Sequence, residues 1–336
     1  MRRVKLVFIA VACLLFIGAA ASALTIKLGS LAPSGSPWEL GLKRMAAEWE
    51  KISNGTVTVK IYAGGVAGDE PDMLRKMRIG TLNAGLITVT GLQGVFNGIK
   101  SLSYPLLIHN DGELSYVLSK MEPFFDAELQ KRGFKPVMWS PGGWVYFFSR
   151  APVVMPEDLK KQKLWVWSGN PDEIQAYQSA GFQTVTLAAT DLMTSLQGGM
   201  VDALVTSPLV AASSQWFGIA GNMSALRLAP LWGATVVSMK SWSEVPVDLQ
   251  PKLIDAAQKI ADSLAPDLLK ADGQAIGVMQ KYGLKINEVT SSARTAWTDL
   301  LDKTFSPLVG KMYDADSFAM ATRYLQEYRA AHQSSP

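Results

Sequence analysis

The side chains that most often carry out chemistry are scarce in this sequence. Its 336 residues include two histidines, His109 and His332, and one cysteine, Cys13. A Ser/His/acid triad would need His109, and no G-x-S-x-G sequence accompanies it. So few His and Cys residues also leave no cluster to hold a metal ion. The sequence therefore predicts a protein that is not an enzyme and that binds neither a cofactor nor a metal.

A glycine-rich run and the acidic residues after it are the next candidates for chemistry. The run from Gly64 to Gly68 lacks the spacing of a phosphate-binding loop or of a dinucleotide-binding motif. We therefore interpret it as a turn between a strand and a helix. Asp69, Glu70 and Asp72 open that helix, where carboxylates complement the helix dipole.

Tryptophan is the abundant residue with binding potential. The chain has ten Trp and 14 Met, and its 32 basic and 29 acidic side chains nearly cancel, which disfavours nucleic acid as a partner. Trp165 and Trp167 are two residues apart on a predicted strand, so they face the same side. Trp38 and Trp49 recur on one helix stripe, and we assign both to the core. The remaining tryptophan side chains indicate that the protein binds an apolar ligand.

The N-terminus has the layout of an export signal. Arg2, Arg3 and Lys5 precede an apolar run that ends at Ile17, and Ala21-Ser22-Ala23 follows it. We predict that residues 1–23 form a signal peptide and that the remaining chain is periplasmic. A signal retained as a membrane anchor stays open as the alternative.

The elements that must position these residues alternate between strand and helix. We predict strands over 24–30, 56–62 and 84–90, then 145–149, 164–168, 201–206 and 232–239. Helices are predicted over 36–52, 69–79, 172–180 and 190–197, and a long helical stretch covers 247–281. Two more helices are predicted over 291–313 and 317–331. This alternation indicates an α/β fold with parallel strands, in two lobes with a ligand cleft between them.

Four stretches in series resemble the solute-binding proteins of tripartite ATP-independent periplasmic (TRAP) transporters, the DctP-type family. They are Leu31 to Trp38, Gly64 to Leu82, Met155 to Val166 and Leu196 to Ala203. The resemblance implies a two-lobed periplasmic binding protein (class II-like) with a long helix that spans both lobes. It further implies discontinuous domains, the first formed by 24–146 and 233–272 and the second by 147–232 and 273–330.

The sequence departs from this family where the family holds its ligand's carboxylate. Trp165 stands where the resemblance implies an arginine, and Trp144 stands near the position of a second one. Indole cannot replace the bidentate grip of a guanidinium group. Thr206 falls near a family asparagine, and Leu31 and Thr88 fall where polar contacts are common. The predicted ligand-binding residues are Trp144, Trp165, Trp167, Trp232, Leu31, Thr88, Thr206 and Ala189.

Three functions follow as hypotheses. The first is a TRAP-type binding protein that captures a hydrophobic small molecule by hinge closure and delivers it to membrane subunits, with a tetratricopeptide-repeat protein as a further candidate partner. The second keeps the family but binds an organic acid through another arginine, with Arg150 preferred over Arg75 and Arg78. The third is a secreted hydrolase, which would depend on His109.

Overall fold

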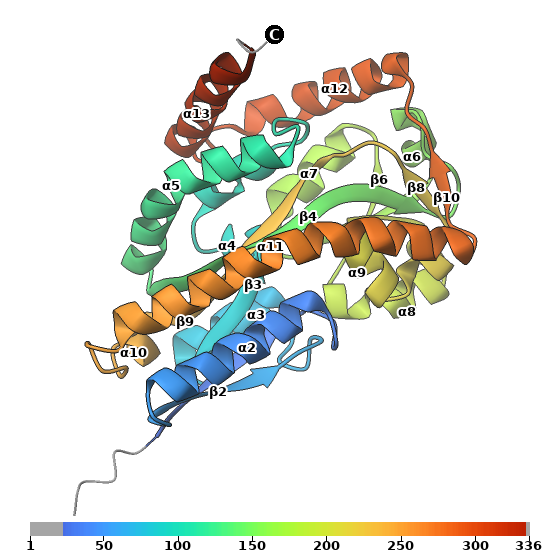
Figure 1. Ribbon diagram of the computed structural model, residues 1–336. Helices are drawn as coiled ribbons and strands as arrows, with labels where there is room; N and C mark the ends of the chain where they lie inside the picture. The colour runs from blue at the N-terminus through green and yellow to red at the C-terminus, as the bar shows by residue number, and fades with distance from the viewer. Residues whose placement is uncertain (1–22, 334–336) are drawn as a thin grey trace, which may run out of the picture.

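One continuous mixed sheet organises the chain in the computed structural model, which describes residues 23–333 (Figure 1). The strand order is β2-β1-β3-β9-β4-β7-β5-β6, with β8 paired to β4 and β10 paired to β8. The predicted signal peptide lies outside the described residues except for Ala23. The strands are β1 (Leu24–Ser30), β2 (Val57–Tyr62), β3 (Ala84–Thr88), β4 (Phe134–Ser149), β5 (Lys163–Trp167), β6 (Gln183–Leu187), β7 (Ala203–Thr206), β8 (Asn222–Ser224), β9 (Ala229–Ser238) and β10 (Lys285–Asn287).

The strand directions divide the sheet into two parallel halves joined by antiparallel strands. β1 pairs in parallel with β2 and β3, and β5 pairs in parallel with β6 and β7. Between these halves, β9 is antiparallel to both β3 and β4, and β4 is antiparallel to β7. The α/β fold is confirmed, but the expectation of parallel strands throughout is wrong. Antiparallel neighbours need no helical crossover, so β4 and β9 can run directly from one half into the other.

The first half of the sheet is covered by helices, some of which have no clear signal in the sequence. Ser36 caps α2 by accepting the Glu39 N–H, as predicted, while the Glu39 carboxylate accepts the N–H of Gly35 at 2.7 Å. Helix α3 ends at Gly80, whose φ of 80° suits glycine. The strand predicted over 84–90 ends at Thr88, where α4 begins, and the unassigned segment after residue 90 holds one helix and a 3₁₀ turn. The helical elements are α2 (Pro37–Ile52), α3 (Glu70–Ile79), α4 (Val89–Leu92), η1 (Asn97–Ser103), α5 (Asp111–Lys131) and α10 (Met239–Trp242).

The second half is covered by shorter helices that follow its strands. Asn170 caps α7 by accepting the N–H of Glu173, and Ser207 caps α9. Among the described residues, no helix is long and apolar enough to span a membrane. The helical elements are α6 (Pro156–Lys160), α7 (Pro171–Ser179), η2 (Ala189–Asp191), α8 (Leu192–Gln197), α9 (Pro208–Ser213), η3 (Trp216–Gly218), α12 (Ser291–Phe305) and η4 (Ser306–Leu308).

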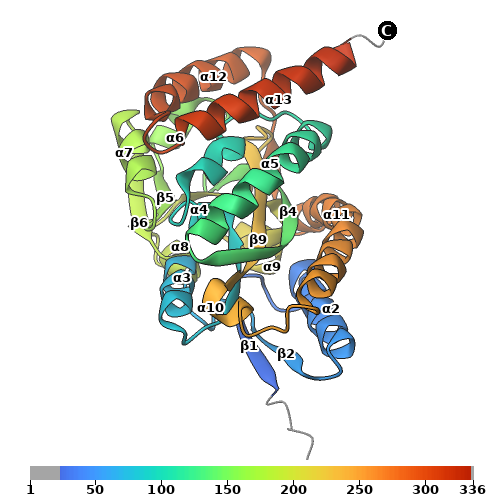
Figure 2. The same ribbon diagram turned by 90° about the vertical axis from the view of Figure 1, so that its left-hand side faces the viewer.

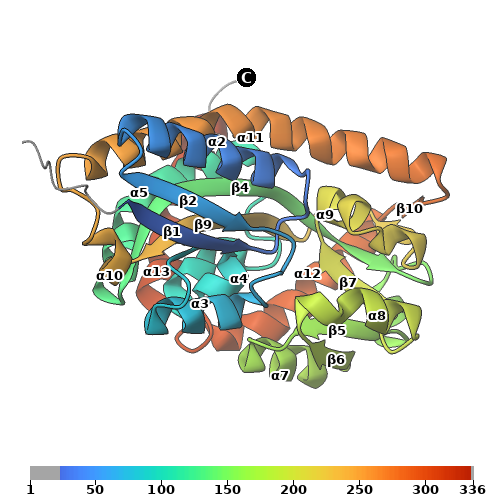
Figure 3. The same cartoon turned by 90° about the horizontal axis from the view of Figure 1, so that it is seen from below.

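One long helix connects the two halves. Helix α11 (Gln250–Lys281) contains 32 residues, with Pro266 inside it, and packs on α2, β4 and α9. Figure 3 shows it running along the molecule beside β4, past the elements of both halves. The predicted long helix across both lobes is therefore present.

The last helix packs against the first half. α13 (Ala315–Gln333) lies beside α5 and η1 (Figure 2), and its Ala321 and Leu325 share a buried cluster with Phe125 of α5. The predicted domain boundaries placed 273–330 in the second lobe. We propose that α13 counts with the first lobe, while the other boundaries stay a prediction.

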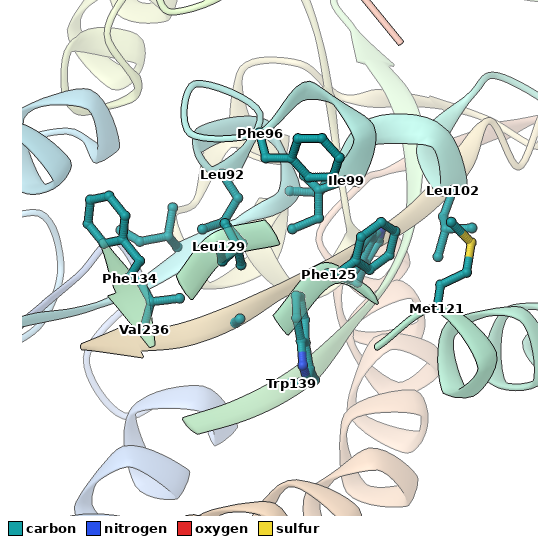
Figure 4. Close-up of a cluster of buried hydrophobic side chains, with 14 of the residues drawn as sticks. Leu92, Phe96, Ile99, Leu102, Met121, Phe125, Leu129, Phe134, Trp139 and Val236 are labelled. Atoms are coloured by element: carbon teal, nitrogen blue, oxygen red, sulfur yellow. The ribbon is translucent and has the colours of Figure 1, made fainter. Parts of the chain in front are cut away.

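The core of the first half fills the space between α5, β4 and β9. Figure 4 shows Met121, Phe125 and Leu129 of α5 gathered with Trp139 of β4 and Val236 of β9. Trp49 is fully buried on the opposite side of the sheet, where its Nε1 donates to the Leu253 carbonyl at 2.8 Å. Its predicted assignment to the core is confirmed.

Candidate ligand-binding site

A cavity of about 570 Å³ lies between the two halves of the sheet. Leu31 follows β1, Thr88 ends β3, Ala189 follows β6 and Thr206 ends β7, and all four line this cavity. Parallel strands of α/β proteins place ligands at their carboxyl ends, which is where these residues lie. The structure thus brings the four predicted positions together around one space.

Five tryptophans contribute to the wall. Trp165 and Trp167 of β5 line the cavity with their ring centroids 6.0 Å apart. Trp232 of β9, predicted with them, also borders the cavity but is only 1% exposed and packs on Phe125 and Trp139. Trp38 also lines the cavity, although we assigned it to the core, and Trp216 lines it without having been singled out. Trp165, Trp167 and Trp216 are only partly buried, so a ligand can still cover part of their surface.

Trp144 is the exception among the predicted aromatic contacts. It is only 3% exposed and does not line the cavity. Its Nε1 donates to Asp111 Oδ1 at 2.6 Å, and the Arg227 guanidinium lies 4.7 Å from its ring centre. A β-bulge between Pro141 and Gly143 shifts the register just before it, and the next side chain, Val145, faces the cavity instead. The prediction that Trp144 lines the cleft is wrong for this reason.

The arginines proposed for an acid ligand also lie elsewhere. Arg150 follows β4 and lies outside the cavity, with its Nε 3.4 Å from Asp202 Oδ1, and it donates to the Leu196 carbonyl. Arg75 pairs with Asp72, and Arg78 lies over the Phe134 ring. Among the described residues that line the cavity, none is an arginine. The hypothesis that Arg150 holds the carboxylate of a ligand in this cavity is therefore wrong.

Three charged side chains reach the cavity wall, namely Glu70, Lys100 and Glu173. Lys100 of η1 forms an ion pair with Glu173 of α7, and its side chain is 7% exposed. Burial lowers the pKa of Lys100, and the neighbouring Glu173 carboxylate acts in the opposite direction. This pair leaves the wall without an uncompensated positive charge.

Glu70 is fully buried at the start of α3. Its carboxyl oxygens accept the Thr88 N–H and the Thr88 hydroxyl, both at 2.8 Å. Burial raises the pKa of Glu70 to about 8, despite these hydrogen bonds. From sequence, Glu70 is expected only to complement the dipole of its own helix. In the structure it also satisfies the backbone where α4 begins.

Asp69 joins the two sides of the cavity. Its Oδ1 accepts the Glu70 N–H within its own helix, while its Oδ2 accepts the indole N–H of Trp167 at 2.6 Å and the Ala189 N–H at 3.1 Å. Trp167 and Ala189 belong to the second half, whereas α3 belongs to the first. The Asp69 carboxylate therefore links the two halves of the sheet by hydrogen bonds beside the cavity.

The residues that sequence reasoning missed share a simple cause. Lys100 lies in the unassigned segment, and Glu173 lies in the first turn of a helix, where acidic residues are common. Asp69 has the same local explanation. Their functional positions depend on contacts between distant segments, which no periodicity reveals.

The other candidates for chemistry take structural roles. The run from Gly64 to Gly68 connects β2 to α3, as predicted. The His109 ring lies by the Leu106 carbonyl and the Arg329 guanidinium, outside the cavity. Within residues 23–333, no group of three or more His, Cys, Asp or Glu side chains is arranged to hold a metal ion.

Comparisons with known proteins agree with this architecture. Residues 28–314 match the DctP family, described as bacterial extracellular solute-binding protein, family 7. A solute-binding protein of Roseobacter denitrificans is 23% identical over 287 residues, which cover 84% of this chain and 87% of that protein. A TRAP periplasmic solute-binding protein of Desulfovibrio salexigens with bound orotic acid superposes with a TM-score of 0.84 at 19% identity, covering 91% of this chain and 99% of that one. Another, from Xanthobacter autotrophicus with bound β-D-galacturonate, has a TM-score of 0.83 at 17% identity, covering 90% of this chain and 99% of that one.

Two α/β lobes that enclose a cavity and share a long helix define a solute-binding protein of the periplasmic type. The chain belongs to the DctP family, bacterial extracellular solute-binding protein family 7. The resemblance drawn from the four sequence stretches is thereby confirmed.

Proposed function

We propose that this protein is the periplasmic solute-binding subunit of a TRAP transporter and that it captures a small molecule with a large apolar body. The observation that carries this proposal is the cavity wall, where five tryptophans lie, three of them partly exposed, and no arginine is present among the described lining residues. A fully covered indole ring contributes up to about 4–6 kcal/mol of apolar burial. A carboxylate buried without a cationic partner costs several kcal/mol.

A second candidate, an organic acid as ligand, is favoured by the comparisons. The similar structures from D. salexigens and X. autotrophicus hold orotic acid and galacturonate. In this chain such an acid would have to take Lys100 from Glu173, because Lys100 is the cation that lines the cavity within the described residues. The organic-acid candidate therefore depends on Lys100 and not on Arg150.

Capture follows from closure of the two lobes around the ligand. The contacts of Asp69 with Trp167 and Ala189 hold the closed arrangement. Opening requires these hydrogen bonds to break, and β4, β9 and α11 connect the lobes throughout. The closed protein then delivers its ligand to the membrane subunits. A tetratricopeptide-repeat partner remains a hypothesis that a pull-down from periplasmic extract tests, and recovery of the membrane subunits alone would count against it.

The decisive experiment identifies what the purified protein carries. Solvent extraction followed by mass spectrometry should recover a neutral, largely apolar compound. Calorimetry should then show binding of that compound and no binding of orotate, galacturonate or succinate at micromolar concentration. Micromolar or tighter binding of any of these acids would establish the second candidate instead.

A further inference from the structure

The ion pair between Lys100 and Glu173 sets the charge that a ligand meets in the cavity. Both side chains line the cavity and come from different segments, η1 and α7, which lie 73 residues apart in sequence. The Glu173 side chain is 24% exposed and the Lys100 side chain is 7% exposed, and both border the cavity. The pair thus forms part of the binding surface.

Glu173 is held in place from its own helix. The Asn170 side-chain amide donates to Glu173 Oε2, the same oxygen that contacts Lys100, and Asn170 Oδ1 accepts the Glu173 N–H at 3.3 Å. No donor among residues 23–333 bonds to the other oxygen, Oε1. Glu173 Oε2 is therefore held by two donors, and Oε1 carries no hydrogen bond within these residues.

This arrangement distinguishes acids from neutral polar groups. A ligand carboxylate on Lys100 would place two negative charges around one buried cation, and such like-charge pairs are unfavourable. A neutral amide instead donates an N–H to Glu173 Oε1 and offers its carbonyl oxygen to the ammonium group of Lys100. In that case the charges of Lys100 and Glu173 still neutralise each other, and each group gains a hydrogen bond to the amide.

We propose that Glu173 is a specificity-determining residue, a built-in counter-ion that occupies Lys100 and makes the cavity select neutral, dipolar ligands over carboxylates. This inference rests on the proposed function, because it concerns the polar end of the ligand whose apolar body the tryptophans cover. Glu173 disfavours carboxylate ligands, so a substitution that removes its charge should allow acids to bind in the cavity.

The test compares hydrocinnamamide with hydrocinnamate, which share one hydrocarbon body and differ in the end group. By calorimetry, the wild-type protein should bind the amide at least about tenfold more tightly than the acid. Glu173→Gln leaves Lys100 without its counter-ion, so this variant should bind the acid at least about tenfold more tightly than the wild type does. The double variant Lys100→Gln with Glu173→Gln should lose that gain, and Glu157→Gln on the exposed end of α6 serves as the surface control.

Each outcome decides the inference. A wild-type protein that binds the acid as well as the amide would overturn it, and this measurement needs no variant. Folded Glu173→Gln protein with no gain in acid binding would also overturn it. If the wild type binds neither compound, the selection of neutral dipolar ligands is overturned, while the apolar-ligand function is decided separately by the compound extracted from the purified protein. If the wild type binds an apolar compound and Glu173→Gln gains nothing, only the inference fails.

Discussion

The contact of Asp69 with the opposite lobe leads to a quantitative prediction about closure. Asp69 is 6% exposed, and its Oδ2 accepts two hydrogen bonds from the second half, from Trp167 and Ala189. Its Oδ1 separately caps α3. A useful substitution must remove the first role and keep the second. Asp69→Ser does so, because serine is as good an N-cap as aspartate while its shorter side chain does not reach across the cavity.

The expected cost follows from the two lost hydrogen bonds. A hydrogen bond to a charged group contributes about 1.5–3 kcal/mol. Water can replace part of each bond at the cavity rim, so we take the lower value for both and expect a loss of about 3 kcal/mol in the free energy of closure. That loss reduces the ratio of closed to open protein roughly 100-fold. The apparent affinity for a ligand that needs the closed state falls with the closed fraction.

The assay pairs this variant with a neighbour on the same helix turn. The Asp72 side chain is half exposed and pairs with Arg75 at 2.8 Å, so Asp72→Ser serves as the matched control. Calorimetry with the compound extracted from the wild-type protein should show much weaker binding for Asp69→Ser than for Asp72→Ser. Small-angle X-ray scattering should also give a larger radius of gyration for Asp69→Ser. Equal affinities and superimposable scattering curves for the two variants would refute the role of Asp69 in closure.

Three further predictions concern the cavity and its surroundings. Trp165→Arg places an unpaired cation in the wall, so calorimetry should show a gain in hydrocinnamate binding and a loss for hydrocinnamamide; unchanged affinities would mean that position 165 does not contact the ligand. Trp144→Phe removes the bond to Asp111 and should lower the free energy of unfolding in urea by about 1–3 kcal/mol while ligand affinity stays within about twofold; a large loss of affinity without destabilisation would contradict the core assignment. The pKa of Glu70 is raised from 4.5 to about 8, so the folded protein keeps a proton that the unfolded chain releases. The free energy of unfolding that this proton contributes is complete below pH 4.5 and is lost as the pH rises through about 8, by up to about 5 kcal/mol in total. In urea unfolding measured across that pH range, Glu70→Gln should flatten the decline. Parallel declines for the variant and the wild type would show that another group is responsible.

The parts of this protein that follow from sequence alone are those governed by local interactions. The Ser36 cap, the stop of α3 at Gly80 and the alternation of β1 depend on residues a few positions apart, so patterning identifies them. The four motifs identify the family for a related reason, since turns and strand ends recur at fixed spacing along the chain. The family resemblance suggested Leu31, Thr88 and Thr206 as ligand contacts, but the predicted strand over 84–90 ran past Thr88, and the structure is what places all three around one cavity.

Tertiary structure decided which side chains face the cavity and what charge they present. The bulge in β4 turned Trp144 into the core, and a one-residue change of register is enough to reverse a side chain's direction. Asp69 meets Trp167 across 98 residues of sequence, and Lys100 meets Glu173 across 73. Such pairings have no local signature because each partner satisfies an ordinary helix or loop pattern by itself. The packing of the two halves against each other is what brings these ordinary residues together around one cavity.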